Sequence, residues 1–446
     1  MRRILMVALA LVMMASFTAC ASTESTAPAP TEAPEAAEPA AEASEATDGK
    51  QVVKIGLLAP ISGAVASQGE MMEAGLRTCI QYFEENVGFK NQTNVEIEVV
   101  VADTESSVDT GVAAFERLVN VDNVDLVIGS YQSAVCSPCA ALANKYKVPY
   151  VICNAVSDKI LAEDANYVFR PCLGDAAEMN NHLEFMQGLS ALDEIKTMAY
   201  VSTADDYGNG ALSIYEWVAS EIGAEMVVVE QVQAGVADMS GVVQKIKQAD
   251  PDICVSALQL NEALLFQRQM REYQCNVPVF AKGAGYNDST FIASSNGTAE
   301  YVTTSTGWLK DSLQFLSEEA AVWAQKIADN NNGLFPNEVG ANAWLCTGVA
   351  LDAIDRVEGE VTRESIAAAL DVTDLDQDHW ANIFFRHPRI SFSDREVNGT
   401  MIYNQNWDAK VQFGQLQNDE WVLVYPFSLV GTTTEDTNPI IWPPQY

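Results

Sequence analysis

The chain has 446 residues, of which 48% are apolar, and it carries 61 acidic against 25 basic side chains, a formal net charge of −36. A field of this sign repels phosphate backbones, so we expect no nucleic-acid partner. The chain is longer than an ordinary domain with a single hydrophobic core, and its length suits two domains.

The N-terminus predicts export from the cytoplasm. The basic start MRR precedes the apolar run ILMVALALVMMASF, and the small residues TA stand directly before Cys20. A helix that spans a membrane needs about 20 apolar residues and different flanks, so we predict a signal peptide over residues 1–19. A cysteine in this place resembles a bacterial lipoprotein cleavage site, which predicts lipidation of Cys20 and anchoring to the outer side of the cell membrane. Phe17 departs from the usual aliphatic residue, so a plainly secreted form is the alternative.

Residues 20–50 predict a disordered acidic linker. After Cys20 the chain consists almost wholly of Ala, Pro, Glu, Ser and Thr and contains no large apolar side chain. Such a segment cannot bury enough apolar surface to offset its ordering entropy. No later apolar run approaches membrane length, so we expect the remainder to be soluble.

From residue 51 onward, predicted strands alternate with predicted helices. The first helical pattern places Met72, Leu76, Ile80 and Phe83 on one stripe. Alternation of this kind predicts parallel sheets that are covered by helices on both faces. The runs predicted as strands are VVKIGLLAP, VEIEVVVAD, VDLVIGS, VPYVIC, TMAYVST, AEMVVVEQ and DICVSAL.

The C-terminal segment over residues 399–426 has a different pattern. GTMIYNQNWDAKVQFGQLQNDEWVLVYP alternates apolar and polar residues, with turn signals at NWDAK and QNDE. This predicts an antiparallel ribbon. Because ligands bind beyond the carboxyl ends of parallel strands, two α/β domains that face each other predict a site in the cleft between them.

The segment IGSYQSAVCSPCAALANKYKVPYV, residues 128–151, contains the start of one predicted helix. Ser133 is a favoured N-cap, and Pro138 is tolerated early in a helix. The unpaired amides and the positive dipole of a helix start suit a carboxylate or another small anion. The alternative is a helix that caps itself and binds nothing.

Cys136 and Cys139 lie three residues apart in this helix and allow several interpretations. They are a structural disulfide or free buried thiols, a redox pair, or part of a metal site. No second pair at zinc spacing follows, so we predict no metal. Apart from Cys20 the chain has eight cysteines, an even number that suits an oxidising compartment, but the sequence does not give their pairing.

An ordered series of segments resembles the leucine/isoleucine/valine-binding proteins of ABC transporters. The series comprises VKIGLLAPISGAVASQGEMMEAG, VVVADTESS, VIGSYQSAVCSPCAALANKYKVPYV, FRPCLGD, DDYGNG and ADMSGVVQKIKQADPDICV, and ISFSDREVNG and VLVYP resemble the closing segments. The likeness covers about residues 52–426. It implies the type 1 periplasmic-binding fold, in which two doubly wound α/β lobes are joined by a three-strand hinge. The crossovers would fall near Pro171, Thr306 and Asp394, so that lobe 1 comprises residues 51–171 and 307–394 and lobe 2 comprises residues 172–306 and 395–446.

The resemblance also implies the ligand-binding residues. A serine after the strand LVIGS holds the ligand carboxylate in the family, and here that residue is Ser133, with Gln132 beside it. The residues expected at the remaining contacts are Ala155 and Ser157 in a second loop, Tyr207 on the second lobe, Ser67 and Gln68 at the rim, and Gln259 and Gly283 at aligned positions.

One departure from the family concerns the ligand's ammonium group. Branched-chain binders carry an acidic residue that pairs with it, whereas the matching stretch VFAKGAGYNDS offers Gly283 or Ala284. A buried ammonium without a carboxylate partner is costly. The ligand is therefore a small amide, a carboxylate without an amine or an aromatic acid, or Asp205, Asp206 or Glu338 supplies the charge.

Catalysis has little support in the sequence. His182, His379 and His387 are expected to be solvated, and no nucleophile, metalloprotease or phosphate-loop motif is present. Trp308, Trp323 and Trp344 are expected in the core or at the rim. We predict a solute receptor without enzymatic activity or cofactor that delivers a small polar ligand to a permease and ATPase complex. A sensor for a membrane partner and an extracytoplasmic thiol enzyme are the alternatives.

Overall fold

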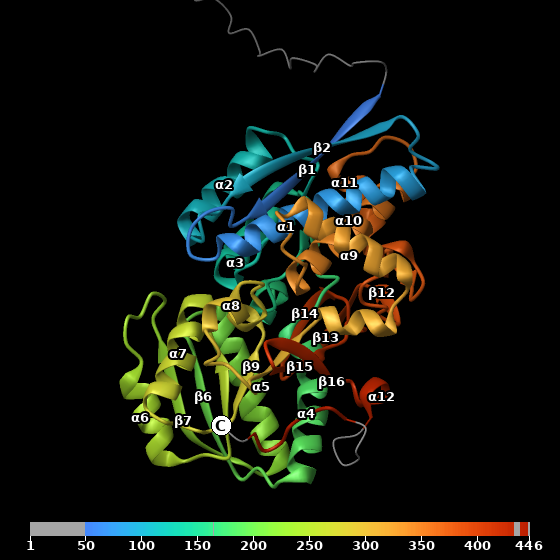
Figure 1. Ribbon diagram of the computed structural model, residues 1–446. Coiled ribbons are helices and arrows are strands. Elements are labelled where there is room, and N and C mark those ends of the chain that lie inside the picture. Colours follow the sequence, from blue (N-terminus) through green and yellow to red (C-terminus); the bar gives the residue numbers. More distant parts are fainter. Residues whose placement is uncertain (1–49, 164, 432–437, 445–446) are drawn as a thin grey trace, which may run out of the picture. The chain divides into compact units, whose positions relative to one another are not determined.

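The computed structural model describes residues 50–163, 165–431 and 438–444 (Figure 1). The predicted signal peptide, Cys20 and the predicted linker up to residue 49 lie outside the described residues. Within the described ranges, no helix is both long enough and apolar enough to cross a membrane.

A five-stranded parallel sheet is built from the first strands of the chain. Ile55 and Leu57 face the apolar cluster on one side of this sheet, and Leu58 faces the cluster on the other side. This alternation follows from the pleat, and because both faces are covered, the strands are almost continuously apolar. The order is β2-β1-β3-β4-β5, with β1 Gln51–Ala59, β2 Val95–Asp103, β3 Leu126–Gly129, β4 Tyr150–Ile152 and β5 Val168–Phe169.

Two groups of helices cover the first sheet. Figure 1 shows the orange α10 beside the blue α1, although they come from distant parts of the chain. A Cβ atom at Gly75 would lie 2.3 Å from the carbonyl oxygen of Gly340, so the close approach of these two helices requires glycine. The first group is α1 Ala66–Tyr82, α9 Glu318–Asn330, α10 Glu338–Arg356 and α11 Arg363–Asp371, and the second is α2 Val108–Asn120 and α3 Ser133–Tyr146.

The second sheet has seven strands and is mixed. It is parallel from β10 to β7, whereas β15 is antiparallel to β10 and β16 is antiparallel to β15. The order is β16-β15-β10-β9-β8-β6-β7, with β6 Thr197–Thr203, β7 Glu225–Val232, β8 Ile253–Ala257, β9 Val279–Lys282, β10 Thr303–Thr306, β15 Gln412–Gln417 and β16 Glu420–Tyr425.

Helices cover both faces of the second sheet as well. α5 begins after Asp205, whose carboxylate accepts a hydrogen bond from the amide of Gly208, and it ends at Gly223 in the left-handed conformation. One face carries α4 Asp175–Leu192 and α5 Asp206–Ile222, and the other carries α6 Ser240–Ala249, α7 Leu260–Glu272 and α8 Phe291–Ser295.

The predicted ribbon over residues 399–426 is only partly correct. β15 and β16 form a hairpin, but β14, Thr400–Gln405, pairs instead with β13, Ser393–Val397, in a separate two-stranded sheet. Ile402 packs into the apolar cluster of the first sheet, whereas Phe413 packs into a cluster of the second. The NWDAK segment therefore connects two sheets and does not turn a hairpin.

We propose that each sheet forms the centre of one lobe. The chain passes between the sheets after β5, after β10 and after β14. The sequence predicts the third crossover near Asp394, and we propose Gln405 instead, because β14 packs against the first sheet. Lobe 1 then comprises residues 51–163, 165–171 and 307–405, and lobe 2 comprises residues 172–306, 406–431 and 438–444.

The prediction for Trp308, Trp323 and Trp344 is confirmed, since all three belong to the core of the first sheet.

The remaining elements are short. The short elements are β11 Asp374–Asp376, β12 Arg389–Ser391, α12 Phe427–Val430, a π-helical turn at Phe83–Val87, and 3₁₀ turns at Asp158–Leu161, Ala284–Asn287, Lys310–Phe315 and Trp380–Asn382.

Candidate functional site

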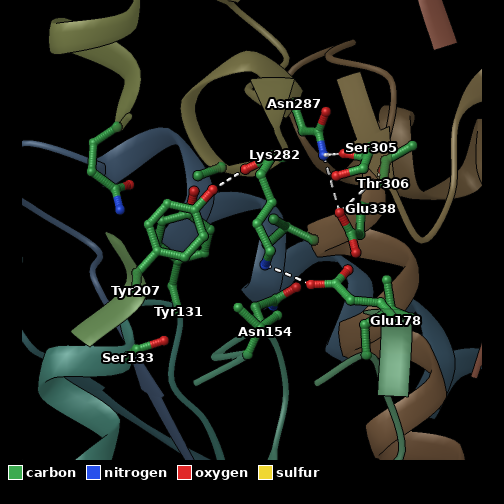
Figure 2. A pocket seen from close by; sticks show the side chains of 16 residues that line it. Tyr131, Ser133, Asn154, Glu178, Tyr207, Lys282, Asn287, Ser305, Thr306 and Glu338 are labelled. Atoms are coloured by element: carbon green, nitrogen blue, oxygen red, sulfur yellow. Dashed lines mark hydrogen bonds and ion pairs between the residues drawn. The ribbon is translucent and has the colours of Figure 1, made fainter. Parts of the chain in front are cut away.

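A cavity of about 60 Å³ lies where the carboxyl ends of strands from both sheets meet (Figure 2). Loops after β3 and β4 line it from lobe 1, and the loops after β8 and β9 and the end of β10 line it from lobe 2. This is where parallel sheets bind ligands. The lining residues are Tyr131, Ser133, Asn154, Val156, Leu173, Glu178, Tyr207, Gln259, Lys282, Gly283, Ala284, Asn287, Ser305, Thr306, Glu338 and Val339.

Ser133 lies at the cavity wall but does not cap its helix. It is the first residue of α3, and Gln132 occupies the N-cap position without a side-chain cap, so the prediction of Ser133 as N-cap is wrong by one residue. The hydroxyl of Ser133 instead accepts a hydrogen bond from the amide of Ser157 at 3.3 Å and fixes the neighbouring loop. The amides in the first turn of α3 still provide the electropositive helix start that a carboxylate favours.

Lys282 is a buried cation in the cavity wall. Its side chain is 3% exposed, and its ammonium lies 2.9 Å from the carboxylate of Asp175 and 2.5 Å from that of Glu178. Burial alone would lower the pKa of Lys282, but these two carboxylates outweigh burial and raise it. Lysine therefore stays charged in this place.

The two carboxylates respond differently to this environment. Burial raises the pKa of Asp175 to about 7, although Lys282 acts against this shift. Burial also acts on Glu178, but there the charge of Lys282 and the hydrogen bond with His182 prevail and lower the pKa to about 2. Glu178 is therefore the main counter-charge of Lys282 at neutral pH.

Glu338 lies on the opposite wall and comes from lobe 1. It is the first residue of α10, and its carboxylate accepts hydrogen bonds from Asn287 at 3.1 Å and from Thr306 at 3.0 Å, which are both on lobe 2. Burial raises the pKa of Glu338. No ion pair of the described residues includes Glu338, so this carboxylate can accept a hydrogen bond from a donor group of a ligand.

Of the three acidic residues proposed for the ligand's ammonium, only Glu338 lines the cavity. Asp205 caps α5 through the amide of Gly208 at 2.8 Å. Asp206 pairs with Lys159 at 3.1 Å. Both carboxylates have partners within the protein and lie away from the cavity.

The structure brings four of the nine predicted contact residues to the cavity. Ser133, Tyr207, Gln259 and Gly283 line it, and the hydroxyl of Tyr207 donates to the carbonyl of Lys282. The sequence did not single out Lys282, Glu178, Asn154, Tyr131 or Asn287. The signal for Lys282 was its position at the end of the strand before Gly283.

The other five predicted residues, Gln132, Ala155, Ser157, Ser67 and Gln68, do not line the cavity. The carbonyls of Ala155 and Ser157 instead accept hydrogen bonds from Arg170. Gln132 precedes α3 as its N-cap residue.

Ser67 and Gln68 connect the two lobes beside the cavity. Their side chains donate to the carboxylate of Asp288 at 2.6 and 2.8 Å. Asn337 adds a bridge, since its amide donates to the carbonyl of Asn287 at 2.8 Å. These three side chains therefore connect the lobes beside the cavity by hydrogen bonds within the protein.

Cys136 and Cys139 are free, buried thiols, like the other described cysteines. Cys136 lies 3.2 Å from the hydroxyl of Tyr150, and Cys139 lies 3.8 Å from the carbonyl of Gly111. Burial raises the pKa of both thiols, which disfavours the reactive thiolate. These positions therefore suit helix packing and not thiol chemistry.

The prediction of solvated histidines is wrong for His182 and His387, which are 0% and 1% exposed. His182 lies on the inner face of α4, where one ring nitrogen is 2.7 Å from the hydroxyl of Tyr215 and the other is 3.4 Å from Glu178. Tyr215 supplies a hydrogen-bond partner for one ring nitrogen, and the carboxylate of Glu178 faces the other, so a buried histidine is tolerated.

Comparisons with known proteins agree with this architecture. A family model described as periplasmic binding protein matches residues 52–402. Leu/Ile/Val-binding protein homolog 7 of Brucella abortus (strain 2308) is 24% identical over 400 residues, which cover 84% of this chain and 91% of that protein.

Solved structures confirm the predicted α/β type 1 periplasmic-binding fold. The branched-chain amino acid transporter substrate binding protein LivJ from Streptococcus pneumoniae, in complex with isoleucine, has a TM-score of 0.68 at 19% identity and covers 84% of this chain and 100% of its own. An ABC transporter solute binding protein from R. palustris, in complex with benzoate, has a TM-score of 0.67 at 17% identity. The match covers 84% of this chain and 96% of that protein.

Proposed function

Because the chain belongs to the periplasmic binding protein family, we propose that it is the receptor of an ABC importer that captures a small polar ligand between its lobes and delivers it to a permease and ATPase complex. Family membership makes it a solute-binding protein of the ABC transporter type and implies a place outside the cytoplasm. A lipid on Cys20 would hold the receptor at the membrane, and residues 20–50 would act as its tether.

The observation that carries this proposal is the polar cavity lined by both lobes. A ligand that contacts both lobes favours the closed over the open arrangement by its differential affinity. The isoleucine and benzoate of the two structural relatives share a carboxylate. The start of α3 with Ser133 suits such a group, and the polar residues around it would reject analogues that leave one of them unpaired.

Replacement of Ser133 by alanine is expected to weaken ligand binding by about 1–3 kcal/mol, because a buried polar group of the ligand loses its partner. The ligand is first found by a thermal-shift screen of the full chain against amino acids, amides and organic acids, since a tight ligand raises the apparent stability. Calorimetry then compares Ser133→Ala with the wild type.

The matched control is Ser213→Ala. Ser213 is exposed on α5, and among the described residues its hydroxyl bonds only to the carbonyl of Asn209 in the same helix. The control should bind like the wild type. Equal affinity of Ser133→Ala and wild type would refute the role of Ser133.

A further inference from the structure

Lys282 is the only basic side chain among the described residues that line the cavity. It is the last residue of β9, and the chain then turns away through Gly283, which has a φ of 50°. Figure 2 shows its side chain reaching from the end of the strand across the cavity wall towards Glu178. The family resemblance implied the following residue, Gly283, whereas the structure places Lys282 in the cavity wall as well.

Lobe 2 alone holds this ammonium in position. Asp175 and Glu178 come from the first turn of α4, and the ring of Tyr207, 5.3 Å away, comes from the start of α5. None of these contacts crosses to lobe 1. The position of the Lys282 ammonium therefore depends on contacts within lobe 2 and not on the position of lobe 1.

The ammonium of Lys282 has one donor more than its two carboxylate partners require. A lysine carries three N–H donors, and the described hydrogen bonds and ion pairs use two of them, towards Asp175 and Glu178. A carboxylate of a ligand can accept the third. An ammonium of a ligand would instead face a fixed like charge, which is costly at a desolvated contact.

The acidic groups on this wall are occupied as well. Asp175 and Glu178 already have Lys282 as their cation, so they offer a ligand ammonium less than a free carboxylate would. Glu338 is the single acidic group in the cavity without a basic partner among the described residues. An amino-acid ligand would have to direct its ammonium there, away from Lys282.

We propose that Lys282 is a specificity-determining residue that takes the place of a ligand's ammonium, so that the cavity selects small carboxylic acids without an α-ammonium group. This inference rests on the proposed function, because it names the ligand class of the same cavity. The ligand carboxylate would lie between the start of α3 with Ser133 and the ammonium of Lys282.

Matched pairs of ligands test this proposal. Calorimetry on the full chain compares leucine with 4-methylpentanoate, phenylalanine with 3-phenylpropanoate, and alanine with propanoate; the members of each pair differ only in the ammonium group. We expect at least one acid to bind, and to bind at least about tenfold more tightly than its amino acid. An amino acid that binds as tightly as its acid would overturn the inference and leave the proposed function intact.

Variants at Lys282 test whether its side chain causes the preference for acids over amino acids. Lys282→Met releases Glu178 and should reduce the preference for the acid at least about fivefold, whereas Lys282→Arg keeps the charge and should keep the preference. Lys245→Met is the matched control, because Lys245 pairs with Glu230 on the surface and is 60% exposed. An unchanged preference in Lys282→Met would overturn the role of Lys282.

Two further outcomes are distinguishable. If Lys282→Met does not fold, the comparison of the ligand pairs on the wild type and on Lys282→Arg still decides the proposal. If no acid, amino acid or amide of the wider screen binds the wild type, the result contradicts both the inference and the proposed function.

Discussion

Replacement of Arg170 by methionine is expected to lower the free energy of unfolding by about 3–5 kcal/mol, the cost of breaking a buried ion pair from one side. Arg170 is 0% exposed, and its guanidinium donates to the carboxylate of Asp158 at 3.0 Å. It also donates to the carbonyls of Ala155 and Ser157 and to the side chain of Gln405. Methionine fills much of the space but donates no hydrogen bond, so each of these acceptors loses the donor that Arg170 supplies.

Denaturant unfolding of the wild type and of Arg170→Met measures this effect. The matched control is Arg117→Met, because Arg117 pairs with Asp122 while 57% of its side chain is exposed. Exposed ion pairs contribute about 0–1 kcal/mol, so the control should unfold close to the wild type. A loss below about 1 kcal/mol in Arg170→Met would show that the network at the crossover does not stabilise the fold.

The titration of His387 is expected to lower the free energy of unfolding as the pH falls. Burial, together with the nearby charge of Lys410, lowers the pKa of His387 from 6.5 to about 3. Between these values the unfolded chain binds a proton that the folded chain does not, so acid favours unfolding. Above pH 6.5 the ring is neutral in both states and the effect vanishes. Between pH 7.5 and 4.5 the loss through His387 should be about 2–3 kcal/mol.

The difference between the wild type and His387→Gln isolates this titration. Asp175 acts in the opposite direction, because its raised pKa of about 7 lets the folded chain gain a proton as the pH falls below 7. That contribution is common to both proteins and cancels in their difference. Denaturant unfolding at pH 7.5 and 4.5 should therefore show a smaller loss of stability in the variant. Equal losses in both proteins would contradict the assignment to His387.

The features that the sequence predicted correctly depend on local patterns. Buried parallel strands such as VVKIGLLAP are continuous apolar runs, and amphipathic helices follow them, so the alternation is visible without tertiary contacts. The start of α3 at the cavity also follows from local order, because it comes directly after β3, whereas Tyr207, which also lines the cavity, was expected only from the family resemblance.

Features that depend on distant partners were missed. Lys282 at the end of a strand normally predicts a solvated side chain, but its partner Asp175 lies 107 residues away in the sequence. His182 and His387 are buried for a similar reason, because the groups that satisfy them, Tyr215 and the amide of Lys410, come from other elements.

The position of the third crossover also required tertiary information. An alternating pattern shows that residues 400–405 form a strand but does not identify the sheet that the strand joins. Burial of Ile402 against the first sheet decides this point, and no local signal reports it.

A crystal structure of the full chain with the tightest-binding small carboxylic acid from the screen would show directly where the protein holds the carboxylate of its ligand. We predict that the acid lies in the cavity between the two sheets, with its carboxylate within hydrogen-bond distance of Ser133 and of the ammonium of Lys282. A ligand bound outside this cavity, or one whose carboxylate points away from both residues, would contradict it.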